Sequence, residues 1–94
     1  MSLGDYEELR ERGQQTLIQF LTVELQLSFS FAESAEENRD RGNDGRYKQC
    51  VQNARKGLET IRHFEGRITD REAWQRIHEQ GDRLEQLLST FPGS

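Results

Sequence analysis

The chain has 94 residues, of which 32% are hydrophobic, 32% are charged and one is proline, and its formal net charge is −4. A chain of this length has room for one hydrophobic core, so we expect a single domain over residues 1–94. No stretch approaches the roughly 20 consecutive apolar residues of a membrane span, and the N-terminus lacks a signal-peptide pattern, which excludes an integral membrane protein and favours a cytoplasmic one.

The first predicted element covers residues 5 to 38 and contains a run, from Val23 to Phe31, in which apolar and polar residues alternate. Alternation is typical of a strand, and a strand here stays the alternative. On a helix, however, the polar residues of this region fall at spacings of three and four, and the segment has no strand partner elsewhere in the sequence. We therefore predict a helix with a narrow polar stripe made of Gln19, Thr22, Gln26, Ser30, Glu33 and Glu37. The opening residues 1–3 are compatible with an expression leader and are left out of this prediction.

The second predicted helix, residues 45 to 67, follows a run of turn residues. Gly42 is suited to end the first helix, and Asn43 or Asp44 to cap the second. Beyond this turn the apolar residues keep to one side of a helix: Tyr47, Cys50, Val51, Ala54, Leu58, Ile61 and Ile68. The segment is therefore predicted to be an amphipathic helix.

The third predicted helix covers residues 70 to 90. It begins at Thr69-Asp70-Arg71-Glu72, which matches the capping box in which a threonine and a glutamate three residues later satisfy each other's free backbone N–H groups. Apolar and small residues then recur every three or four positions, the pattern of a helix that packs on a neighbour: Trp74, Ile77, Gly81, Leu84, Leu88 and Phe91. Pro92 and Gly93 end it.

The short connection between the first two helices predicts an antiparallel hairpin. Charge favours this pairing, because residues 1–41 carry nine acids and four bases (net −5) and residues 42–68 three acids and six bases (net +3). The predicted fold class is therefore all-α, an antiparallel helical hairpin plus a third helix. This three-helix bundle would become a larger bundle if the chain dimerises.

Residues 31–59 carry a spacing that resembles a known family. From Phe31 through Ala35, Gly42-Asn43 and Ala54 to Leu58 and Glu59, the order of aromatic, small and turn residues resembles a single tetratricopeptide-type helical hairpin. The resemblance covers about a third of the chain, and no second copy of the period follows, which excludes a repeat array. It implies a scaffold that binds other proteins and carries no chemistry.

The usual markers of metal, cofactor and nucleotide sites are missing from the sequence. The turn at residues 40–45 resembles the start of a calcium loop, but Gly42 and Val51 stand at positions three and twelve, where oxygen ligands are needed, so the ligand set is incomplete. The spacings of Cys50, His63 and His78 match no common zinc site. No nucleophile elbow or phosphate loop is present. We therefore predict no metal, no cofactor and no catalytic residue.

A nucleic-acid partner is also not expected. Lys48, Arg55 and Arg62 recur every seven residues along the second predicted helix, but the chain is acidic and Glu59 lies among them. Phosphate binding depends on an uncompensated basic field, so these side chains are assigned to packing against the acidic first helix.

The first helix carries an apolar arc of about 240° between Leu17 and Phe31, wider than the roughly 100° that one neighbouring helix requires. Two explanations stay open: the other two helices cover the surplus, or a second copy does. A homodimer would bury Phe20, Leu21, Leu25 and Phe29 in a helical interface. We therefore predict a non-enzymatic protein–protein interaction or self-association module.

Glu24 is the one acidic residue predicted on this apolar arc, where a carboxylate must find a partner or an opening to water. Arg55 and Arg62 are the expected partners. The alternative function is a small helical-bundle enzyme or ligand-binding protein organised around Glu24, in which Tyr47, Cys50 or His78 reaches the same cavity. That alternative requires these side chains to converge.

Overall fold

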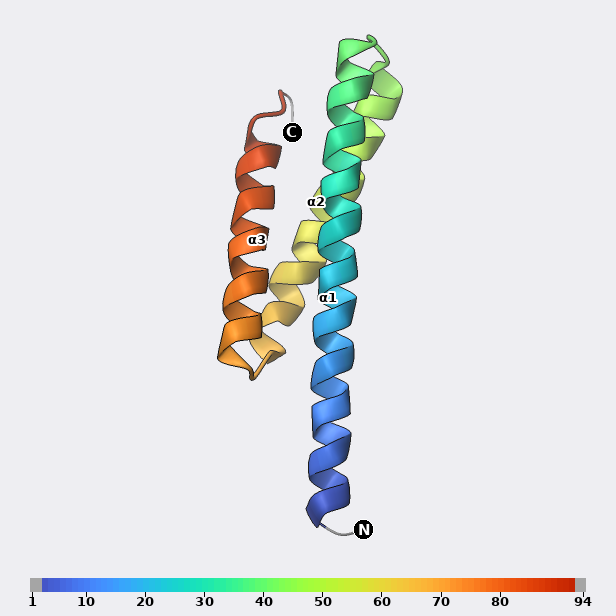
Figure 1. Ribbon diagram of the computed structural model, residues 1–94. Coiled ribbons are helices and arrows are strands. Elements are labelled where there is room, and N and C mark those ends of the chain that lie inside the picture. Colours follow the sequence, from blue (N-terminus) through green and yellow to red (C-terminus); the bar gives the residue numbers. More distant parts are fainter. Residues whose placement is uncertain (1–2, 93–94) are drawn as a thin grey trace.

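The computed structural model describes residues 3–92. Met1 and Ser2, two of the three residues that are compatible with an expression leader, lie outside the described residues. Three α-helices and a short 3-10 turn follow one another in the order α1, α2, η1 and α3. Helices α1 and α2 form an antiparallel hairpin, and α3 packs along its side (Figure 1). The all-α prediction is confirmed: within residues 3–92 the chain forms no strand.

Helix α1, Leu3–Asp40, contains 38 residues and is somewhat longer than the predicted 5 to 38. The alternating run from Val23 to Phe31 is helical throughout, as its polar stripe predicted. A helix of this length spans about 57 Å, at roughly 1.5 Å per residue, which accounts for the longest dimension of the molecule, 60 Å, against 19 and 15 Å in the other directions.

The turn after α1 stops the helix through a glycine. Gly42 has a φ of +75°, a left-handed conformation that glycine adopts without penalty. Its N–H donates to the carbonyl of Arg39, and the N–H of Asn43 donates to the carbonyl of Asn38 at 2.8 Å. This pair of bonds is the Schellman motif, which satisfies carbonyls that a helix end would leave without donors. Gly42 is the stop that the sequence predicted.

Helix α2, Asp44–Phe64, begins one residue before the predicted 45. Asn43, one of the two predicted caps, accepts the N–H of Arg46 on its side chain. The helix ends earlier than the predicted residue 67. The chain tightens into the 3-10 turn η1, Glu65–Arg67, and becomes extended at Ile68. Ile68 is 7% exposed, so its extended backbone directs this side chain into the core before α3 begins.

Helix α3, Arg71–Ser89, is capped by Asp70, whose side chain accepts the N–H of Glu72. The predicted capping box with Thr69 as its first residue is therefore wrong by one position. The N–H of Thr69 donates instead to Oε1 of Gln14 at 2.9 Å, and the Gln14 amide donates to the carbonyl of Arg67 at 3.0 Å. These bonds hold the α2–α3 connection against α1, and they give the N–H of Thr69 the acceptor that the predicted box assigned to Glu72.

The core lies where the three helices meet. Ser28, Ala32 and Ala35 of α1 form a seam of small residues, and all three are at most 1% exposed. Small side chains allow α1 and α2 to approach closely, since a Cβ added at Gly57 of α2 would collide with the Ser28 hydroxyl. Trp74, predicted in the α3 seam, lies instead at its edge and is 36% exposed. The buried hydrophobic residues are Leu21, Leu25, Ala32, Ala35, Val51, Ala54, Ile61, Ile68, Ala73, Ile77, Leu84, Leu88 and Phe91.

Candidate protein interface

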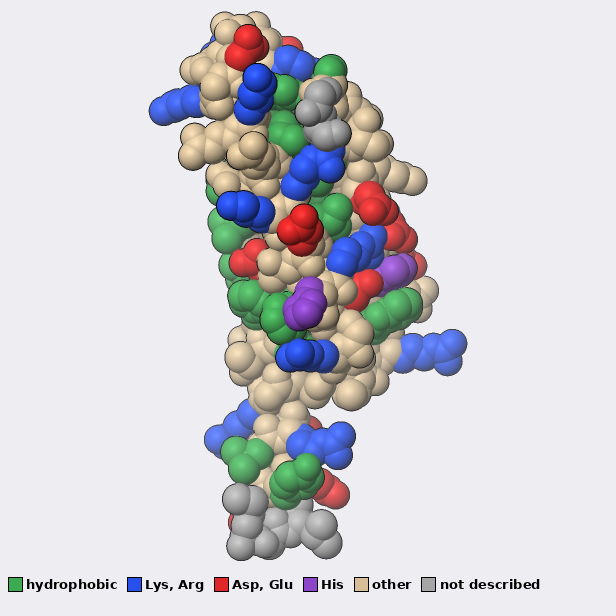
Figure 2. All heavy atoms as spheres, turned by 180° about the vertical axis from the view of Figure 1, so that it is seen from behind, with side chains coloured by type: hydrophobic (Ala, Val, Ile, Leu, Met, Phe, Trp, Pro, Cys, Tyr) green, Lys and Arg blue, Asp and Glu red, His purple; other side chains and the backbone are tan. Residues whose placement is uncertain are grey.

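Helix α1 carries an apolar face that no other part of the described chain covers. Five large hydrophobic side chains on it are 44 to 55% exposed: Tyr6, Leu9, Phe20, Val23 and Leu27. Together with Gly13, Thr16 and Ser30, which are also exposed, they are spaced three and four residues apart over almost four heptads. We call these eight residues the exposed stripe. Hydrophobic side chains line this edge of α1, on the side away from α3 (Figure 2).

A second seam runs along the same helix with the same spacing. Leu21, Leu25, Ser28, Ala32 and Ala35 are separated by four, three, four and three residues, and all of them are buried within the chain. One helix therefore presents two seams of heptad type, an inner one that packs on α2 and α3 and an outer one that faces solvent. Two seams on one helix are typical of a helix with neighbours on both sides.

The first turns of α1 extend beyond the rest of the fold. Residues 4–13, which we call the N-terminal extension, are all exposed, and the first half-buried residue is Gln14. Figure 1 shows this part of α1 continuing past the ends of α2 and α3 as a single helix. These ten residues include two glycines, Gly4 and Gly13, which weaken a helix, and their side chains gain nothing from packing within the described chain. The N-terminal extension is therefore accessible to a partner, and packing against one would stabilise its helix.

Phe20 lies where the exposed stripe meets the end of α2. Its ring packs edge-on against the half-buried Phe64, with ring centroids 6.3 Å apart. The guanidinium of Arg67 lies over the other ring of this pair, 4.9 Å from the centroid of Phe64. Apolar surface thus continues from the stripe onto α2.

The structure separates the four residues predicted to form an interface. Leu21 and Leu25 are 0% and 6% exposed and belong to the chain's own core, so the prediction that they form an intermolecular surface is wrong. The reason is that α2 and α3 cover this side of the wide apolar arc. Phe29 is half-buried and lines a hollow of about 500 Å³ between α1 and α3. Phe20 alone lies on the exposed stripe, which the residues Tyr6, Leu9, Val23 and Leu27 complete.

Glu24 is half-buried on α1, as its place on the apolar arc predicted. Among residues 3–92, however, its carboxylate forms no ion pair, so the predicted pairing with Arg55 or Arg62 is wrong. Arg62 is directed toward α3 instead. The buried Nε of Arg55 has no hydrogen-bond partner in the described part of the chain. Arg10, on the N-terminal extension, likewise forms no ion pair within the residues described.

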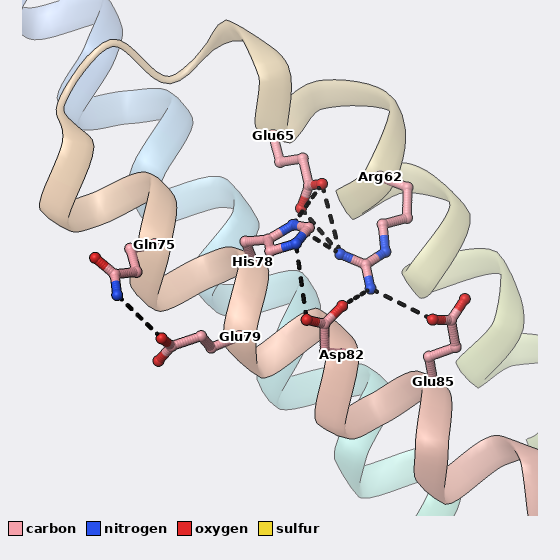
Figure 3. Close-up of polar contacts among 7 residues, drawn as sticks. All are labelled: Arg62, Glu65, Gln75, His78, Glu79, Asp82 and Glu85. Carbon is pink, nitrogen blue, oxygen red and sulfur yellow. Dashed lines mark hydrogen bonds and ion pairs between the residues drawn. The ribbon is translucent and has the colours of Figure 1, made fainter.

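Arg62 is the centre of a polar cluster that joins α2 to α3 (Figure 3). Its Nη2 lies 2.6 Å from Oδ1 of Asp82 and 3.7 Å from Oε2 of Glu85, and its Nη1 lies 3.3 Å from Oε2 of Glu65. Burial lowers the pKa of the Arg62 guanidinium, but the hydrogen bond that it donates to Asp82 and the negative charge of Glu65 outweigh this effect, so the pKa lies above its ordinary value. Arg62 therefore stays charged at any physiological pH.

His78 completes this cluster. Its Nδ1 lies 3.0 Å from Oε1 of Glu65 and 3.2 Å from Nη1 of Arg62, and its ring stacks on Trp74 at 4.6 Å. A protonated Nδ1 donates to Glu65, whereas an unprotonated one accepts from Arg62, so either form keeps a partner. Gly81 leaves the space for the guanidinium, since an added Cβ would lie 3.0 Å from Arg62. The arrangement is a clasp between α2 and α3 in which Glu65, Asp82 and Glu85 each lie within 4 Å of the Arg62 guanidinium.

Two residues of the predicted enzyme alternative, Tyr47 and His78, lie far apart. The hydroxyl of Tyr47 donates to the carbonyl of Pro92 at 3.1 Å, and its ring packs against Phe91, beyond the C-terminal end of α3. His78 lies 13 residues before Phe91, about 20 Å away along a helix. Cys50 is a half-buried free thiol. Tyr47 and His78 therefore cannot reach one cavity beside Glu24.

Three further observations complete the description of this chain. Within residues 3–92, no three His, Cys, Asp or Glu side chains are grouped so that they could hold a metal ion. None of the helices in the same range combines the length and the apolar character that crossing a bilayer requires. Comparisons with protein-family models, with curated proteins and with solved structures found no match to this chain.

Proposed function

We propose that this protein is a non-enzymatic helical interaction module that binds a protein partner through the exposed stripe of α1. The observation that carries the proposal is the second seam itself, five large side chains about half exposed and spaced for helix–helix packing. Soluble proteins rarely expose a large contiguous apolar surface, and where they do, this surface marks an interaction site. The partner therefore presents an apolar helical face of its own.

The fold supports this function in two ways. The body, built from α2, α3 and the second half of α1, holds the stripe on a rigid helix, which favours binding because little order must be gained. The N-terminal extension offers a further stretch of the same stripe away from the body (Figure 1). The tetratricopeptide-like spacing of residues 31–59 points to the same class of function, a scaffold for other proteins.

The proposal is tested by site-specific photo-cross-linking in the cells that produce the protein. A benzophenone side chain replaces Val23 on the stripe, and a matched chain carries it at Glu37, which is exposed on the polar face of the same helix. We expect cross-linked protein products from the Val23 position and few from Glu37. Equal yields from the two positions, or no products from Val23, would overturn the proposed function.

A further inference from the structure

We infer that the exposed stripe receives a second copy of the same chain, with the two α1 helices antiparallel; this inference rests on the proposed function and names its partner. The length of the two parts of the stripe gives the first reason. Residues 6–16 lie on or next to the N-terminal extension, and residues 20–30 lie on the body. Each part covers eleven residues, about 16 Å of helix. An antiparallel pair lays each extension along the body of the other copy.

The shapes of the side chains select one register. The stripe residues occupy the two core positions of a heptad, a and d. In an antiparallel pair, each a residue of one helix lies opposite a d residue of the other. If Leu9 lies opposite Leu27 of the second copy, every other stripe residue also gains a partner, and large side chains meet small ones. Val23 then faces Gly13, Phe20 faces Thr16 and Tyr6 faces Ser30. A shift of one heptad in either direction leaves Leu27 or Tyr6 uncovered.

The same register brings together two charges that lack partners in the single chain. Arg10 and Glu24 both flank the stripe on its α2 side, and in this pairing Arg10 of one copy lies next to Glu24 of the other, twice by symmetry. Within residues 3–92 neither side chain forms an ion pair. The half-buried position of Glu24 is thereby explained, because a carboxylate there gains the partner that Arg55 and Arg62 do not supply.

The wider charge distribution agrees with this arrangement. The N-terminal extension carries four acids and two bases, net −2, whereas α2 carries five bases and two acids, net +3. In the antiparallel pair each extension runs beside the α2 of the other copy, whose face bears several Lys and Arg side chains (Figure 2). Asp5 approaches Glu33 of the second copy at the solvent-exposed ends, where salt screens the repulsion.

The test uses sedimentation equilibrium of the full chain and a charge exchange. We expect the wild-type protein to dimerise, and the single variants Arg10→Glu and Glu24→Arg each to raise the dissociation constant about tenfold, because two ion pairs become two repulsions. The double variant should return to within about threefold of wild type. Arg12→Glu, the same change on the same extension opposite an uncharged Gln26, is the control and should have less than about a threefold effect.

Disulfide cross-linking gives the direction independently. Two variants are made in a Cys50→Ala background, one with Leu9→Cys and one with Leu27→Cys. Each variant is oxidised by itself, and a mixture of the two is oxidised in parallel. Both positions are exposed in the single chain, so the fold is retained. We expect cross-linked dimers only in the mixture. A monomer at all concentrations, a dimer whose double variant is not rescued, or cross-linking within either chain alone would overturn the inference. A monomer that still cross-links to another protein through Val23 would leave the proposed function standing.

Discussion

The close approach of α1 and α2 at Gly57 allows a direct test of how the hairpin packs. A Cβ added there would collide with the hydroxyl of Ser28 and lie 3.1 Å from its Cβ, tighter than ordinary contact. Ser28 is 1% exposed, so its side chain has no open space to move into. The substitution Gly57→Ala therefore forces the two helices apart or Ser28 into another rotamer.

The magnitude follows from two opposed terms. Overpacking a core typically costs about 1–3 kcal/mol. Replacing a glycine inside a helix by alanine stabilises the helix by about 1 kcal/mol, because alanine has the higher helix propensity. The difference is a net loss of about 1 kcal/mol, which lowers Tm by about 4–8 °C in a domain of this size.

Urea unfolding followed by circular dichroism measures this loss, with Gly45→Ala as the control, because Gly45 lies in the first turn of α2 with nothing within 4 Å of an added Cβ. We expect the control to be neutral or slightly stabilised. The pair Ser28→Gly and Gly57→Ala should lose less than the sum of the two single variants, since the new methyl group fills the vacated space. A Gly57→Ala variant as stable as wild type, or strict additivity, would refute the reasoning about this contact.

Three further changes test other parts of the fold. Arg62→Met removes the centre of the α2–α3 clasp and should cost roughly 1–2 kcal/mol in low salt and less in high salt, as measured by urea unfolding; a loss that does not depend on salt would contradict the role of charge. Gly42→Ala places a side chain at a φ of +75° and should lower stability by about 1 kcal/mol, whereas Gly66→Ala should not. Leu84→Ala, at a fully buried position, should cost about 2–5 kcal/mol, and a smaller loss would show that the core collapses around the cavity.

Local spacing was enough to predict most of the fold. The polar stripe of the first helix, at Gln19, Thr22 and Gln26, outweighed the alternation at Val23 to Phe31, because alternation signals a strand only when a second strand is available. Gly42 and Asn43 marked the turn by chemistry that needs no distant contact. The N-cap of α3 was missed by one residue, because Thr69 and Asp70 both carry an oxygen that can cap a helix and Asp70 is the one that does. The bond between Gln14 and the N–H of Thr69, 55 positions away, could not be predicted from local spacing.

The candidate interface was only partly predictable. The width of the apolar arc indicated that something covers it, but a single sequence does not say which side the other helices take. Leu21 is buried in the inner seam and Val23 is exposed in the outer one, although both residues lie within the predicted arc. The alternating spacing of three and four residues from Tyr6 to Leu27 was the missing signal. It continues through Gly13 and Thr16, two residues that a search for hydrophobic side chains does not count. Arg62 pairs with Asp82 and Glu85 on α3 and not with Glu24. These acids are 20 or more residues away along the chain, so the pairing could not be read from local spacing.

Hydrogen–deuterium exchange over residues 4–13 tests the central claim most directly. The amides of the N-terminal extension have no tertiary protection in the single chain, because every side chain there is exposed. If the stripe binds a second copy, we expect these amides to be protected at high protein concentration and to exchange quickly on dilution, with Leu27→Ser abolishing the difference. Fast exchange that is the same at all concentrations would contradict self-association through α1.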